Sequence, residues 1–351
     1  MRVWVICDRI NAMNTELLTI TDARADQDAI RRAGEVIRAG GLVAFPTETV
    51  YGLGADAFNA DAAKKIYAAK GRPSDNPLIV HIADIASLDE VACDIPDQAR
   101  TLAERFWPGP FTMILHKRDK LPLETTGGRD TVAMRFPDNA CAQALIQAAG
   151  GYICAPSANV SGKPSPTTGA DVMEDLNGRV DIVLDDGASV VGLESTIVDM
   201  TCDPPEVLRP GAVTLEQIKE IIPGIALHTA SSEDEARAPG MKYRHYAPKA
   251  PLHLCSGAVV VDQIQLACDE DKKKGLKTGI LTCSENAPFY RADCIQVLGS
   301  ERDPEEMAHR LYACLRAFDR AGVDVIYSET FGGEGIGQAL MNRLTKAAAD
   351  D

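Results

Sequence analysis

The sequence predicts an α/β protein with two domains. Short apolar runs, typical of buried strands, alternate with amphipathic helical stretches along most of the chain, and this pattern favours sheets covered by helices. The length of 351 residues is more than one hydrophobic core usually serves. The pattern is lost between residues 223 and 250. We therefore expect an N-terminal extension over 1–20, a first domain over 21–222, a linker over 223–250 and a smaller domain over 251–351.

Charge and cysteine content disfavour several classes of protein. The net charge of −15 argues against a broad nucleic-acid-binding surface, although a local basic pocket for a small anion remains compatible with it. The ten cysteines contain no CxxC pair and the six histidines show no ligand spacing with them, so we expect reduced thiols and no structural zinc. The first apolar run is too short for a signal sequence, and no run reaches membrane length. These features predict a cytoplasmic protein.

The stretch from 42 to 82 organises the first domain. A helix over 26–38 is stopped by Gly40 and Gly41, and a buried strand over 42–45 follows and ends at Pro46. A second helix, over 59–70, has Asp61 as its expected cap. A strand over 78–82 closes the unit. Such strand–helix–strand units place polar residues at strand ends, where open α/β sheets bind ligands.

The polar residues of this stretch suit a phosphorylated ligand. Lys70 and Arg72 stand where the second helix gives way to a loop held extended by two prolines, and Asn76 adds a neutral donor. Thr47 and Thr49 put small polar groups at the end of the first strand. The alternative is that Lys70 and Arg72 only neutralise the helix C-terminus.

Arg135 lies among apolar residues in the next conspicuous strand, 131–136. A helix over 97–107 and a strand over 111–116 precede it. An arginine in this position is exposed on an edge strand, paired with an acid, or used to hold a carboxylate ligand. The sequence leaves these three alternatives open.

A loop rich in hydroxyls and amides follows the strand 152–155. It reads APSANVSGKPSPTT and offers many neutral donors to an anion. The alternative is an ordinary turn-rich connection. Ser157 lacks the following glycine of the G-x-S-x-G motif, so we do not interpret it as a hydrolase nucleophile.

The rest of the chain continues the alternation. In the first domain we expect strands over 181–185, 195–199 and 206–208 and a helix over 214–222 capped by Thr214. In the second we expect strands over 252–255, 258–261, 278–283, 294–298 and 323–328, and helices over 262–274, 304–321 and from about 337 to 348. The glycine-rich segment 331–337 matches no phosphate-loop pattern, and we interpret it as a loop and helix cap.

Six motifs together resemble the YrdC-domain family, in its long form with a second α/β domain. They are PTETVYGLGADA, KGRPSDNPLIVH, SANVSGKPSPT and ESTIVD, followed by LRPG and RHYAP. They stand in the family's order and cover residues 27–250 densely and the remainder more loosely. The resemblance implies a twisted, open, mixed sheet with helices in the first domain and a Rossmann-like α/β second domain.

The resemblance also implies an activity, that of a nucleotidyltransferase. In this family the amine of L-threonine takes up bicarbonate or carbon dioxide as a carbamate. The carbamate attacks the α-phosphate of ATP and gives L-threonylcarbamoyladenylate and pyrophosphate. A separate transferase then moves the threonylcarbamoyl group to an adenosine beside the tRNA anticodon. Because the product is labile, a cavity that excludes water is expected.

The resemblance also implies site residues, which we assign to this chain where its motifs match those of the family. The catalytic positions are Lys70, Arg72, Ser157 and Asn159. The ATP-binding positions are Arg72, Asn76, Thr131, Ser157, Ser165, Arg209 and Tyr246. The L-threonine-binding positions are Thr49, His81, Arg135, Ala155 and Ser195. None is a compelling covalent nucleophile, so catalysis would rest on positioning and charge stabilisation. Mg²⁺ is implied as the companion of ATP, and no metal ligands are expected from the protein itself.

The segment 239–248, PGMKYRHYAP, carries more aromatic and charged residues than a linker needs. We expect it to fold over the cavity as a lid, with Tyr246 against the nucleotide. The alternative is that it packs on the surface and only orients the second domain. Rival functions are a non-catalytic RNA-binding module of the same fold, a carbamoyl transferase and a ligand sensor. Direct tRNA binding is doubtful because of the net charge.

Overall fold

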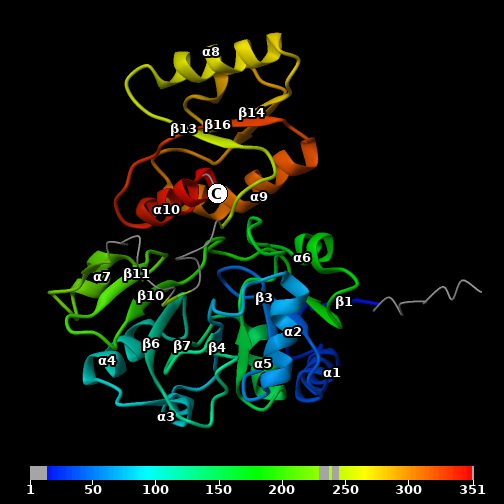
Figure 1. Ribbon diagram of the computed structural model, residues 1–351, viewed down its shortest axis with the longest axis vertical. Coiled ribbons are helices and arrows are strands. Elements are labelled where there is room, and N and C mark those ends of the chain that lie inside the picture. Colours follow the sequence, from blue (N-terminus) through cyan, green and yellow to red (C-terminus); the bar gives the residue numbers. More distant parts are fainter. Residues whose placement is uncertain (1–13, 229–236, 239–244, 350–351) are drawn as a thin grey trace, which may run out of the picture.

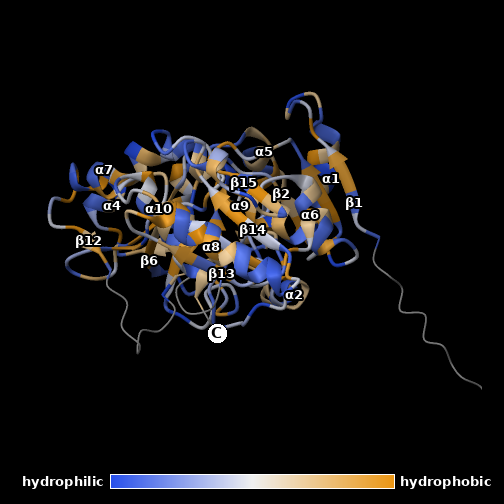
Figure 2. Ribbon diagram, turned by 90° about the horizontal axis from the view of Figure 1, so that it is seen from above, coloured by the Kyte–Doolittle hydropathy of each residue, from blue (hydrophilic) through white to orange (hydrophobic). Residues whose placement is uncertain are grey.

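The computed structural model describes residues 14–228, 237–238 and 245–349. The chain forms two α/β domains, with the smaller one stacked on the larger (Figure 1). Apolar residues gather on interior strands such as β14, whereas the outer helix α8 shows many hydrophilic residues (Figure 2). The expected α/β fold with a large mixed sheet and a second domain is therefore confirmed. No helix of the described residues is long and apolar enough to cross a membrane.

A mixed sheet of twelve strands forms the first domain. Its path runs β1-β9-β2-β3-β8-β4-β7-β6-β10-β11-β12, with β5 paired to β6 at one side. The strands are β1 (Glu16–Thr19), β2 (Val43–Phe45), β3 (Gly52–Asp56), β4 (Ile79–His81), β5 (Ala92–Cys93), β6 (Phe111–Lys117), β7 (Thr131–Arg135), β8 (Ile153–Ala155), β9 (Ile182–Asp185), β10 (Thr196–Asp199), β11 (Glu206–Arg209) and β12 (Ala226–Leu227).

Helices of the first domain cover this sheet and bury its apolar residues. They are α1 (Gln27–Arg38), α2 (Ala60–Lys70), α3 (Leu88–Val91), α4 (Asp97–Phe106), α5 (Ala140–Ala148), α6 (Gly169–Leu176) and α7 (Leu215–Lys219), with the 3-10 turn η1 (Ile85–Ser87). The cap of α7 is Thr214, as expected, and it forms a capping box with Gln217. The expected cap of α2 was wrong, because Asn59 accepts from the amides of Asp61 and Ala62.

The unit over 42–82 contains a strand that the sequence analysis missed. β3 lies between β2 and α2 and pairs antiparallel with β2. The Phe45 ring crosses two glycines of β3, and a Cβ on Gly52 or Gly54 would lie 3.0 or 2.9 Å from that ring. Glycines in a strand often mark such close approaches. Here they hid the strand, because its sequence lacks the alternating apolar pattern.

The N-terminal and linker boundaries differ from the expectation. Residues 16–19, expected in an extension, form β1 and pair in parallel with β9. Within the expected linker, β12 continues the sheet beside β11. Residues 1–13, and 229–236 and 239–244 of the linker, lie outside the described part of the chain.

The second domain is a parallel sheet of order β13-β16-β14-β15. Its elements are β13 (Leu252–Cys255), α8 (Val260–Lys273), β14 (Thr278–Thr282), η2 (Ala287–Phe289), β15 (Cys294–Val297), α9 (Pro304–Ala321), β16 (Val325–Glu329) and α10 (Ile336–Ala348). The strand expected over 258–261 is wrong, because Val260 and Val261 open α8. β-branched residues have strand propensity, but here the helix that follows decides the conformation.

Helices α9 and α10 lie between the second sheet and the first domain (Figure 1). Val50 and Leu193 of the first domain belong to the same apolar cluster as Leu311 and Leu340 of these helices. Arg316 of α9 forms a buried ion pair of 2.9 Å with Asp175 of α6. The two domains therefore share part of one core.

Candidate functional site

A cavity lies where the first domain, the linker and the second domain meet. Its wall is built from the ends of β2, β4, β7 and β8, the loop before β10 and the linker residues that precede β13. The lining residues are Thr47, Thr49, Val50, Tyr51, Gly52, Arg72, Ile79, His81, Arg135, Ala155, Pro156, Ser157, Asn159, Glu194, Ser195, Arg209, His245 and Tyr246. Polar side chains from eight segments of the chain, Arg72 after α2 and Arg209 at the end of β11 included, thus converge on one cavity.

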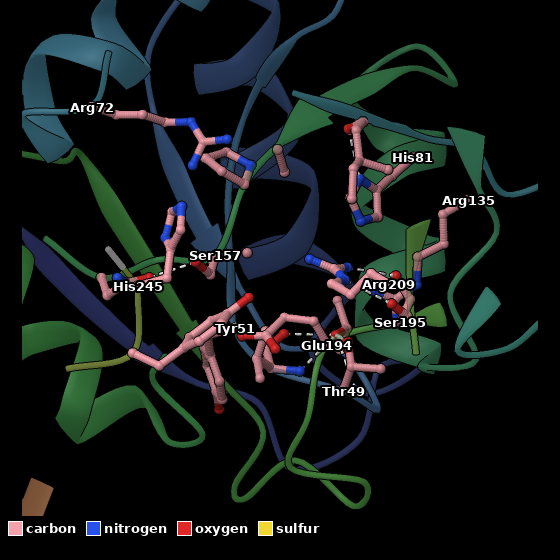
Figure 3. Close-up of a pocket in the computed structure, with 18 residues that line it drawn as sticks. Thr49, Tyr51, Arg72, His81, Arg135, Ser157, Glu194, Ser195, Arg209 and His245 are labelled. Carbon is pink, nitrogen blue, oxygen red and sulfur yellow. Dashed lines mark hydrogen bonds between the residues drawn. The ribbon is translucent and has the colours of Figure 1, made fainter. Parts of the chain in front are cut away.

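The sequence-predicted residues divide between two sides of this cavity. Figure 3 shows Arg135, His81, Ser195 and Thr49 on one side, with Arg72 and His245 on the other. All five predicted L-threonine-binding residues line the cavity. So do Arg72, Ser157, Asn159, Arg209 and Tyr246 from the predicted nucleotide and catalytic sets. The family assignments are therefore spatially coherent for these ten residues.

Arg135 is buried at the end of β7, which lies between β4 and β6. The alternative of exposure on an edge strand is thus wrong. The Nη2 atom of Arg135 lies 2.8 Å from Oε2 of Glu48. The two groups form an ion pair, but their relative orientation does not meet the geometry of a hydrogen bond. The Nε and Nη2 donors of Arg135 have no hydrogen-bond partner in the described structure. Buried donors of this kind are costly unless something satisfies them, so this guanidinium is poised to accept a carboxylate.

Ser195 is fixed from two sides. Its hydroxyl lies 2.8 Å from the Thr112 hydroxyl, and Arg209 donates to the carbonyl of Ser195 at 3.0 Å and to its hydroxyl at 3.2 Å. Thr49 is held similarly by Thr47, with 2.8 Å between their hydroxyl oxygens. The cavity therefore presents hydroxyl groups whose positions are set before any ligand arrives.

Arg72 is oriented by its own loop. Its Nε donates to the Asn76 carbonyl at 3.2 Å and an Nη donates to the Pro77 carbonyl at 3.0 Å. In the described structure no carboxylate forms an ion pair with it. Burial lowers the pKa of Arg72 to about 10, so the guanidinium remains charged at neutral pH. Its charge is therefore available to an anion in the cavity.

Lys70 does not line the cavity but supports a wall of it. Its ammonium donates to the carbonyls of Ser157 and Asn159, both at 2.5 Å. The Ser157 hydroxyl in turn donates to Oδ1 of Asn159 at 2.5 Å. Burial, with the nearby charge of Arg72, holds the pKa of Lys70 well below its ordinary value. Lys70 thus fixes the loop that carries two predicted catalytic residues.

Three further predicted ATP-binding residues do not line this cavity. Asn76 is buried behind Arg72, Ser165 donates to Oε1 of Glu194 at 2.6 Å, and Thr131 begins β7 at the end opposite Arg135. For these three residues the family assignment stays a prediction.

The two cavity histidines are neutral. Burial lowers the pKa of His81 to about 3, and its Nδ1 lies 3.0 Å from the Ile79 carbonyl. Burial also lowers the pKa of His245 to about 3. Neither side chain carries a positive charge near neutral pH, so the positive charge of the cavity comes from its arginines.

Glu194 is the cavity residue that the sequence analysis missed. It stands in the ESTIVD motif beside Ser195, but its partners Tyr312 and Arg343 are more than a hundred residues away in the sequence. No local pattern marks such a contact. Tyr51, which also lines the cavity, was likewise not singled out.

Family models match both domains. One, described as "Telomere recombination" for Sua5, YciO and YrdC proteins, matches residues 35–211. A second, described as the C-terminal domain of threonylcarbamoyl-AMP synthase, matches residues 213–349.

Several known proteins are similar to the chain. A threonylcarbamoyl-AMP synthase of Bacillus subtilis is 48% identical over 94% of this chain and 96% of its own length. A crystal structure of Pyrococcus abyssi Sua5 complexed with L-threonine has a TM-score of 0.89 and 45% identity, over 95% of this chain and 97% of that one. A shorter putative synthase of Mycobacterium tuberculosis is 36% identical over 59% of this chain and 95% of its own. By these matches the chain belongs to the threonylcarbamoyl-AMP synthase family, in its two-domain form.

Proposed function

We propose that the chain converts L-threonine, bicarbonate or carbon dioxide, and ATP into L-threonylcarbamoyl-AMP and pyrophosphate. The observation that carries the proposal is the convergence of two arginines in one cavity: Arg135, two of whose donors have no hydrogen-bond partner in the described structure, and Arg72, with which no carboxylate of the described residues forms an ion pair. A relative with the same two-domain fold has been crystallised with L-threonine. The family relation supports a catalytic role over that of a non-catalytic RNA-binding module.

L-Threonine would occupy the side of the cavity that holds Arg135. Its carboxylate would take the open donors of Arg135, and its hydroxyl and amine would meet Thr49, His81 and Ser195. Ala155 would contribute only backbone groups. The neutral His81, whose Nδ1 donates to the Ile79 carbonyl, can accept one hydrogen bond at Nε2 without adding charge beside Arg135.

ATP would lie on the side that holds Arg72, with its phosphates extending towards Arg209, which donates to Ser195. The carbamate oxygen of the threonine adduct forms a bond to the α-phosphorus, and the bond from that phosphorus to the pyrophosphate oxygen breaks. The charge that moves onto the pyrophosphate would be stabilised by Arg72, with Ser157 as a neutral donor. The chemistry is adenylyl transfer, which makes the enzyme a nucleotidyltransferase.

Mg²⁺ would enter with the phosphates of ATP rather than through a cage of protein side chains. Among the described residues no three potential metal ligands gather. Magnesium commonly keeps several waters and binds through substrate phosphates, which suits a site whose own charge is cationic.

The linker would act as the lid. His245 and Tyr246 line the cavity, and the cavity volume of about 50 Å³ is far below the roughly 300–1,000 Å³ of ordinary ligand pockets. These residues would have to withdraw for ATP to enter and return to exclude water from the labile product. The product would then pass to a separate tRNA-modifying transferase in the cytoplasm.

The test is a set of reactions with purified chain and no RNA. We expect pyrophosphate only when ATP, L-threonine and bicarbonate are all present, with the adenylate identified by mass spectrometry. Equal release of pyrophosphate without L-threonine would overturn the proposal. Carbamoyl transfer from carbamoyl phosphate, tested in parallel, is expected to be absent.

A further inference from the structure

Glu194 belongs to the first domain and lines the cavity, but the second domain holds its carboxylate. Arg343 of α10 donates from Nε to Oε2 at 2.8 Å. The Tyr312 hydroxyl of α9 lies 2.8 and 2.9 Å from the two carboxylate oxygens. Arg343 and Tyr312 are completely buried.

The carboxylate of Glu194 is ionised. Burial alone would raise its pKa, but the charges of Arg343 and Arg209 and hydrogen bonds from Ser165 and Arg343 lower the pKa to about 2. A full negative charge therefore lies on the wall of a cavity that we propose receives the triphosphate of ATP. Unless it is compensated, this charge would repel the phosphates and offset Arg209 beside it.

Arg343 is tied to the same wall by further contacts. It donates to the Pro210 carbonyl at 2.9 Å and to the Glu194 carbonyl at 3.2 Å. Its guanidinium lies 5.7 Å from the centre of the Tyr246 ring, and the ring of Tyr312 lies 5.5 Å from that of Tyr246. The second domain thus holds both the acidic wall residue and the aromatic residue of the lid.

We propose that Arg343 is a positioning and charge-compensating residue of the site: it neutralises Glu194 and seats Tyr246, so that the cavity accepts ATP only when the second domain is docked. The proposal deepens the proposed function and rests on it. It gives the second domain a direct part in nucleotide binding. The shorter relatives, which match little beyond the first domain, would have to balance this wall in another way.

The test measures ATP binding by calorimetry in charge variants of the full chain. Arg343→Met removes one of the two arginine charges that compensate Glu194, so we expect ATP to bind at least about tenfold more weakly. Arg343→Lys keeps the charge and should retain most of the affinity. The double variant Arg343→Met with Glu194→Gln removes both charges and should recover much of the loss, which a purely structural role for Arg343 would not produce.

The matched control is Arg316→Met. Arg316 also forms a buried ion pair across the interface, with Asp175 at 2.9 Å, but it does not line the cavity. It should change ATP affinity less than about twofold, because its charge balances a carboxylate outside the site. An equal loss in both single variants would overturn the proposal.

A further variant covers the case in which Arg343→Met does not fold. Glu194→Gln alone removes the negative charge and leaves Arg343 in place, so it should bind ATP more tightly than wild type. Weaker binding would contradict charge compensation, as would a double variant no better than Arg343→Met. If wild type itself fails to bind ATP, the proposed function falls rather than this inference.

Discussion

Arg135 illustrates how a single side chain can be read only in part from sequence. Its position among apolar residues left three alternatives open: an exposed side chain, a pair with an acid, or a ligand-binding role. The structure shows that Arg135 is buried and forms an ion pair with Glu48. The pair keeps the guanidinium from being an isolated buried charge. The donors that remain unsatisfied make the difference between a structural ion pair and a ligand site.

We expect Arg135→Ala to raise KM for L-threonine by about 10- to 100-fold, the size of one or two lost charge-assisted hydrogen bonds. KM for ATP should change little, because Arg72 lies on the other side of the cavity from Arg135 (Figure 3). Steady-state kinetics with each substrate varied in turn measure the split. The control is Arg31→Ala, whose exposed side chain pairs with Asp28 and Glu35 of α1. Equal effects on both substrates would contradict the assignment.

Arg72→Ala should lower turnover by about 10²–10³, as the loss of a preorganised donor to transition-state charge typically does. Single-turnover formation of the adenylate measures this step. Lys64→Ala, which removes an exposed cation of the preceding helix α2, is the control and should retain wild-type turnover. A fall in affinity for ATP with unchanged turnover would show that Arg72 only binds the substrate.

Lys70 calls for a different expectation, because it supports the wall rather than the ligand. In Lys70→Met the carbonyls of Ser157 and Asn159 lose their shared donor, at about 1–3 kcal/mol for each buried group left unpaired. The variant should therefore lose both turnover and stability, measured by urea unfolding. If Lys70→Met lost turnover but kept wild-type stability, we would conclude instead that the Lys70 ammonium contacts the phosphates of ATP.

At the scale of elements, the sequence predicted the helices and strands that have a clear local pattern of apolar residues. The helix over 304–321 matches α9 residue for residue, since it is long, amphipathic and stopped by a glycine. β3 was missed because Gly52 and Gly54, which make room for the Phe45 ring of β2, remove the alternating apolar pattern by which a strand is predicted. Helices α5 and α6 were also missed. Motif residues located ten lining positions, whereas the partners of Glu194 depend on how two domains dock.

The β2–β3 hairpin should be intolerant of side chains on its glycines. In Gly54→Val a Cβ would lie 2.8 Å from Cγ2 of Ile153 and 2.9 Å from the Phe45 ring. Overpacking of this kind costs about 1–3 kcal/mol. Because Phe45 also packs edge-on against His81 at 5.8 Å, the KM for L-threonine should rise as well. Urea unfolding gives the free energy, with Gly224→Ala, which meets no atom within 4 Å, as the control. A variant as stable as wild type would contradict the packing argument.

At the scale of the whole molecule, the two domains are bound by more than the linker. Buried ion pairs such as Arg316–Asp175 and Arg343–Glu194 join α9 and α10 to the first domain. Breaking one partner of such a pair is costly, so each fixes the docking geometry more than it adds net stability. The cavity is lined by the first domain and the linker, and the second domain packs against two of its lining residues, Glu194 and Tyr246.

The shared apolar cluster has a consequence for heat unfolding. Val50 follows Thr49 directly, Leu193 precedes Glu194, and both pack into the core of the second domain. The second domain cannot lose its core without exposing residues that hold the cavity walls in place. Differential scanning calorimetry should therefore record one endotherm with equal calorimetric and van't Hoff enthalpies, and activity should disappear along the same curve. Two resolved endotherms would mean that the domains melt independently despite their common core.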